Sequence, residues 1–223
     1  MPANLATIIN YATRELRDQA SHYTTAQLQN LAKDVIEDEF SQIRPAIKVI
    51  DVDGNGTRLY AISLLGSDWV EGFSQIQYIH FPIDEDDPNY LETDSFIVEE
   101  KPDGTFRLRF EEDSPSSSED FRVAYTYPHT VTIATDTTSI ITRDERAAGM
   151  LLGREVLESL ANEFAQLANV NAGKVRIDFM ATSKRCENRA KEVHEKLKRA
   201  LSYPGFVAAR GRPVHKTLFF KHN

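Results

Sequence analysis

One acidic loop, at residues 51–56, has the spacing of a chemical motif. It reads Asp-Val-Asp-Gly-Asn-Gly, which matches the opening of a calcium loop of the EF-hand type. Such a loop needs a bidentate carboxylate at its twelfth position. That position is Ile62, which lies in a predicted strand and not in an exiting helix. The pattern therefore favours a tight hairpin turn over a calcium site.

Two further groups of polar residues have the chemistry of metal ligands. Residues 84–87 are four consecutive carboxylates, whereas a two-metal hydrolase gathers its carboxylates from separate strands so that they converge. We therefore expect a solvated loop. His80 and His129 lie at predicted strand ends, and no third ligand follows at a suitable spacing. We expect both histidines to be partly buried structural residues.

Single residues with possible functional roles also have structural interpretations. Cys186, the only cysteine, lies on the apolar seam of a predicted helix, where a cysteine packs as a small hydrophobe. Gly149 and Gly153 are followed by charged residues, which favours close packing in a helical bundle over dimerisation in a membrane. Trp69 is expected to anchor a loop onto the β domain, and exposure of Trp69 would instead indicate an interface.

Motifs typical of enzymes are missing from the sequence. It contains no Walker loop, dinucleotide-binding fingerprint, H-E-x-x-H zinc motif or nucleophile elbow. We therefore predict no catalytic residues, no metal and no cofactor, and a protein that is not an enzyme. A metal-dependent hydrolase remains an alternative.

Four segments have the apolar period of a helix. They cover residues 4–19, residues 24–40 behind a capping box, a long stretch from Thr142 to about Leu167, and residues 183–201. The apolar faces are Leu5, Ile8, Ile9, Ala12 and Leu16 in the first helix, and Cys186, Ala190, Val193, Leu197 and Leu201 in the last.

Between the second and third helices the sequence has the pattern of short strands. Residues 106–110 and 121–125 alternate with period two, as half-buried strands do. Residues 101–104 read Lys-Pro-Asp-Gly, which predicts a turn. Further strands are predicted at residues 47–52, 58–64, 76–81 and 95–99.

The order of these elements predicts an α+β fold. Residues 1–44 and 136–202 are expected to form a four-helix bundle-like α domain, because two helical hairpins bury their apolar faces best against each other. Residues 45–135 are expected to form an inserted antiparallel β domain, a small sandwich or barrel. Residues 203–223 are predicted to be an extended basic C-terminal arm, which folds back onto the β domain or adds a strand to a neighbouring subunit.

Charge is distributed unevenly along the 223 residues. Residues 45–142 contain six basic and 19 acidic side chains, whereas residues 203–223 contain four basic and no acidic ones. An acidic middle argues against a broad nucleic-acid interface, which needs clustered Lys and Arg. No apolar run reaches the roughly 18 residues of a membrane span, and the N-terminus lacks a signal pattern, so we expect a cytosolic protein without membrane contact.

The order and layout of several segments, spread over most of the chain, resemble a known family. These segments are Asp51–Tyr60, Trp69–Ser74, Tyr78–Ile83, Val123–His129, Asp136–Thr138, Arg143–Glu145 before the long third helix, and Ser183–Arg185. In this arrangement the chain resembles the head–tail connector proteins of tailed bacteriophages, the adaptor or head-completion proteins of the neck.

The resemblance implies a virion protein of the neck, made in the host cytoplasm. Subunits of that family form a homo-oligomeric ring, expected here with twelve copies, between the portal protein and the next neck or tail protein. Genome DNA would pass through it without sequence-specific binding, and the family has no catalytic residues to carry over. Another virion assembly protein, such as a tail terminator or a minor capsid factor, is an alternative.

The C-terminal arm is the predicted interaction site. Family members often reach their neighbours through such arms, and a ring subunit contacts the next copy through two different patches of its surface. We expect Arg210, Arg212 and Lys216 to pair with carboxylates of an adjacent subunit or of the portal. The apolar anchor of the arm is predicted to be Leu218, Phe219 and Phe220.

Overall fold

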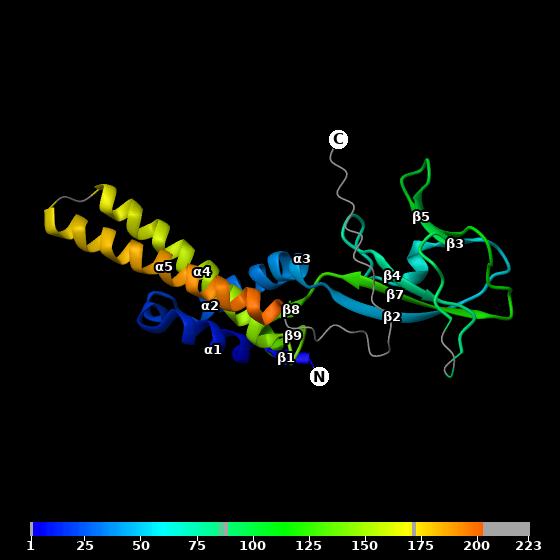
Figure 1. Cartoon of the computed structure of the whole chain (residues 1–223), viewed down its shortest axis with the longest axis horizontal. Helices are drawn as coiled ribbons and strands as arrows, with labels where there is room; N and C mark the ends of the chain where they lie inside the picture. Colours follow the sequence, from blue (N-terminus) through cyan, green and yellow to red (C-terminus); the bar gives the residue numbers. More distant parts are fainter. Residues whose placement is uncertain (1, 85, 87–88, 171–172, 203–223) are drawn as a thin grey trace.

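The structure is a computed structural model that describes residues 2–84, 86, 89–170 and 173–202. It is a mixed α and β fold in which a long helical part and a β part lie end to end (Figure 1). The helices are α1 (Leu5–Leu16), α2 (Thr25–Asp34), α3 (Ser41–Ile43), α4 (Glu145–Val170) and α5 (Gly173–Ser202), with the 3-10 helices η1 (Arg17–His22), η3 (Ile62–Leu65) and η4 (Ile133–Thr135) and the π-helix η2 (Val35–Phe40).

The helices follow the apolar pattern closely. Every apolar residue predicted for the face of the first helix is buried, and the capping box formed by Thr24 and Gln27 is present at the start of α2. The glycines of α4 let α1 approach closely, because a Cβ atom at Gly149 would lie 2.7 Å from the Ile8 carbonyl oxygen. The prediction of close helix packing at these glycines is therefore confirmed.

The last helix begins earlier than predicted. We expected it to begin at Ser183, but α5 begins at Gly173. Ser183 therefore lies inside α5 and does not cap its start. Its buried hydroxyl donates to the Ala161 carbonyl of α4 at 2.9 Å. As a result α4 and α5 form a long antiparallel hairpin, whose far end extends beyond α1 and α2 (Figure 1).

The strands form three small antiparallel sheets, with the orders β2-β7-β4, β3-β6-β5 and β1-β9-β8. The first two share one hydrophobic core, and the third packs with the helices. The strands are β1 (Pro2–Asn4), β2 (Ala46–Asp53), β3 (Leu59–Ala61), β4 (Ile76–His80), β5 (Phe96–Glu100), β6 (Phe106–Phe110), β7 (Asp120–Tyr127), β8 (Val131–Thr132) and β9 (Thr137–Ile141).

Two sequence predictions about the strands need correction. The hairpin expected at residues 51–56 is instead a connection between sheets, because β2 pairs with β7 and β3 pairs with β6. The strand expected over residues 58–64 ends at Ala61, and its apolar continuation forms η3, which buries Ile62 and Leu65. Burial of neighbouring apolar residues in a helical turn outweighed their preference for a strand.

The core of the helical part is larger than the one that the helices alone would form. Val131 of β8 and Ile140 of β9 belong to it, although Val131 lies inside the range predicted for the inserted β domain. The chain crosses between the two parts twice, after α3 and after β7. No helix among the described residues is long and apolar enough to cross a lipid bilayer.

Candidate functional site

The acidic loop at residues 51–56 is held by contacts within the protein. The Asp51 carboxylate accepts a 2.6 Å hydrogen bond from Arg122 of β7, and this bond lowers the pKa of Asp51. The Asn55 side-chain oxygen accepts from the backbone amide of Thr57, and the Asn55 backbone amide donates to the Tyr60 hydroxyl. Across the residues that the structure describes, no three His, Cys, Asp or Glu side chains gather as a metal site.

The two histidines have separate structural partners. His80 is buried, and its Nε2 accepts a hydrogen bond from the backbone amide of Asp84. This contact anchors the start of the acidic run, in which Asp84 and Asp86 are exposed. His129 is also buried, as expected, and it lies where the chain passes from the β part back to the helical part.

Cys186 and Trp69 also occupy structural positions. Cys186 is buried in the helical core, and this burial raises the pKa of its thiol. Trp69 packs partly buried against the β core, with its ring 5.5 Å from that of Tyr125. The prediction that Trp69 anchors a loop is therefore confirmed.

The junction between the two parts is a network of buried and partly buried polar groups. His129 Nε2 lies 2.9 Å from the Arg44 carbonyl oxygen, so it must carry the proton, and Nδ1 accepts from the Ser139 hydroxyl. The Arg44 guanidinium in turn pairs with the buried Asp144 just before α4, at 3.1 Å. The two segments that connect the helical part to the β part, after α3 and after β7, therefore contact each other at this network.

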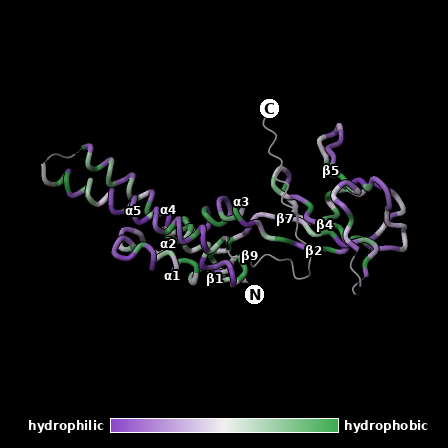
Figure 2. Tube along the Cα trace, viewed as in Figure 1, coloured by the Kyte–Doolittle hydropathy of each residue, from purple (hydrophilic) through white to green (hydrophobic). Residues whose placement is uncertain are grey.

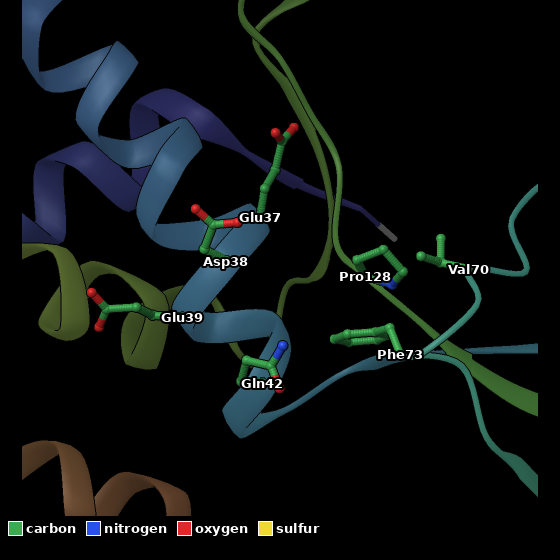
Figure 3. A pocket seen from close by; sticks show the side chains of 7 residues that line it. All are labelled: Glu37, Asp38, Glu39, Gln42, Val70, Phe73 and Pro128. Atoms are coloured by element: carbon green, nitrogen blue, oxygen red, sulfur yellow. The ribbon is translucent and has the colours of Figure 1, made fainter.

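An open hollow of about 340 Å³ lies beside this junction. Figure 3 shows the helical side, from η2 and α3, facing Pro128 and a loop of the β part. The hollow combines carboxylates on one wall with apolar side chains on the other. Its lining residues are Glu37, Asp38, Glu39, Gln42, Val70, Phe73 and Pro128.

The three carboxylates of the hollow differ in their partners. Glu37 accepts a hydrogen bond from the backbone amide of Val131. Glu39 turns toward α4, where it pairs with Arg154 at 3.1 Å, and its pKa is raised by burial and by the nearby Glu155 carboxylate. Asp38 is exposed, and no cation among the described residues pairs with it. The wall of the hollow thus retains uncompensated negative charge.

The far end of the α4–α5 hairpin is a second unusual surface, which we call the hairpin tip. Figure 2 shows hydrophobic residues continuing to this end, beyond the other helices. Ile177 is 66% exposed and Met180 is 55% exposed. Arg176 and Lys184 are exposed beside them. The large exposed apolar residues of the tip are Val170, Val175, Ile177 and Met180.

Neither surface was among the sequence predictions. The hollow is built from segments far apart in the chain, so no local pattern marks it. The sequence pattern predicts a last helix that begins at Ser183, so it does not predict the tip. One signal was present: Val175, Phe179 and Ser183 continue the four-residue spacing toward the N-terminus. The arm residues predicted as the interaction site lie outside the described residues.

Comparisons with known proteins provide no further assignment. A scan against protein-family models found no matching family, and a search of curated proteins found no match.

Proposed function

We propose that this protein is a structural subunit of a tailed-phage neck and not an enzyme. In this proposal twelve copies form an adaptor ring that joins the portal protein to the next neck or tail protein. The ring sits in the virion between head and tail, and its subunits are made in the host cytoplasm. The layout of the sequence segments described above supports this function.

The structural observation that carries the proposal is the separation of unlike surfaces on one elongated chain. The junction hollow is acidic, whereas the hairpin tip is basic and apolar. A subunit of a closed ring needs two different patches, because each copy contacts the next head to tail. A protein that binds only a small ligand has no need of two such patches.

In this proposal the helical part and the β part have different roles in the subunit. We propose that the helices form a bundle-like domain that makes the ring wall, and that β2 to β7 form a small antiparallel sandwich inserted into it. The acidic excess of residues 45–142 suits a channel for DNA, because negative charge repels the phosphate backbone and lets it slide without binding.

The C-terminal arm provides the direct test of assembly. In this proposal Arg210, Arg212 and Lys216 pair with carboxylates of an adjacent subunit or of the portal, and the apolar anchor is Leu218, Phe219 and Phe220. Deletion of residues 204–223 should leave the fold intact and abolish incorporation into particles. Incorporation is measured by immunoblotting of purified virions, and circular dichroism checks the fold. A folded variant incorporated at the wild-type level would contradict the arm's role.

A further inference from the structure

The hairpin tip exposes apolar side chains that a soluble helix normally covers. Besides Ile177 and Met180, Val170 at the end of α4 is 80% exposed. Ile177, Met180 and Lys184 follow one another at helical spacing, so they lie on the same face of α5. An exposed apolar cluster with a polar rim is typical of a protein–protein contact.

The charge of the tip indicates what kind of surface would cover it. Residues 175–185 contain three basic residues and one acidic residue, which leaves a net charge of +2. A complementary surface therefore needs carboxylates next to apolar side chains. The junction hollow has this composition, with Glu37 and the exposed Asp38 on one wall and Val70 and Phe73 on the other.

One copy cannot bring its own tip into its own hollow. Arg154 of α4 touches Glu39 of the hollow, and α4 continues for sixteen residues from Arg154 to Val170. At 1.5 Å per residue the tip lies about 24 Å further along a rigid helix. Any contact between the two surfaces must therefore join two copies of the chain.

We propose that the hairpin tip of one subunit docks into the junction hollow of the next. Ile177 and Met180 contact Val70 and Phe73, and Arg176 lies against Asp38 of the neighbouring copy. The contact is heterologous, so it repeats around a ring. This inference rests on the proposed ring-subunit function and names the surfaces through which the copies meet.

Two complementary variants test this contact in the full-length chain. The tip variant carries Ile177→Asp and Met180→Asp, and the hollow variant carries Asp38→Arg and Val70→Arg, all at partly or fully exposed positions. Self-association is measured by sedimentation velocity at low salt over a concentration series. Each variant should associate at least tenfold more weakly than the wild type.

Mixing the two variants is the decisive step. The tip variant keeps an intact hollow and the hollow variant keeps an intact tip, so the mixture should form a 1:1 heterodimer that cannot grow further. The control Lys191→Glu reverses an exposed charge of α5 away from the tip and should associate like the wild type. Failure of the mixed variants to pair, or a wild-type chain that stays monomeric at its highest soluble concentration, would overturn the contact.

The C-terminal arm is the competing occupant of the hollow. A full-length variant with Arg210→Gln, Arg212→Gln and Lys216→Gln should still pair through the tip. Loss of pairing in this variant, together with wild-type association of the tip variant, would make the arm the occupant and refute the docking of the tip. Binding of the wild-type protein to portal rings tests the proposed function independently of the tip contact. A wild-type chain that lacks the tip contact but binds portal rings would leave that function standing.

Discussion

At the scale of single residues, His129 connects the two parts of the molecule. Its ring bonds to the Arg44 carbonyl and to the Ser139 hydroxyl, and its backbone amide donates to the Ser41 hydroxyl at 2.7 Å. Burial lowers the pKa of His129 below the ordinary value of 6.5, although the nearby Asp144 acts in the opposite direction. The neutral ring is therefore the form that the folded protein prefers.

This lowered pKa predicts a pH-dependent stability. Below about pH 6.5 the unfolded chain binds a proton at His129 that the folded chain binds less well, so the free energy of unfolding should decrease as the pH falls. Well above pH 6.5 the ring is neutral in both states, and the contribution is fully present. Urea unfolding between pH 7.5 and 5.5 measures this slope. His129→Gln should be less stable at pH 7.5 and should flatten the slope, whereas an unchanged slope would contradict this role.

At the scale of elements, the position of α1 on α4 depends on the lack of side chains at two glycines. A Cβ atom at Gly149 would overlap the side chain and backbone of α1, whereas one at Gly153 would lie 3.2 Å from the Glu15 Cβ atom. Glu15 itself links α1 to α5 through Arg189 and Lys196, at 2.9 Å and 2.8 Å. Close packing of α1 on α4 thus positions Glu15 for its ion pairs with α5.

Alanine substitutions at the two glycines should have unequal effects. Gly149→Ala should reduce the free energy of unfolding by roughly 1–3 kcal/mol, because the α1 backbone must move away. Gly153→Ala is the matched control, since it gains the same helix propensity with a milder overlap. Chemical denaturation of both variants measures the difference. Equal stabilities, or a more stable Gly149→Ala variant, would show that α1 does not pack as described.

The sequence predicts helices, caps and turns correctly where the pattern of neighbouring residues determines them. The apolar face of α1, the capping box at Thr24 and the turn at Gly104 all depend on nearby residues, and the structure confirms them. Sheet pairing was not predictable, because the partner of β2 lies about 70 residues away in β7. The hollow depends on tertiary contacts in the same way, whereas the spacing of Val175, Phe179 and Ser183 did mark the earlier start of α5.

At the scale of the whole molecule, charge and apolar surface are arranged along one long axis. The acidic β part lies at one end and the helical hairpin extends to the other (Figure 1). The junction hollow is lined by residues of both parts. Attraction between unlike surfaces of successive copies favours assembly most at low ionic strength. The proposed ring subunit is therefore expected to assemble more weakly as salt is added.

The most direct test of the ring-subunit proposal is the native mass of the full-length protein at low salt. It is measured for the protein alone and mixed with portal rings, with electron micrographs of the same samples. We predict closed rings near twelve copies, formed by the protein alone or assembled on the portal. A chain that is monomeric alone and remains unbound in the mixture would contradict the proposed function.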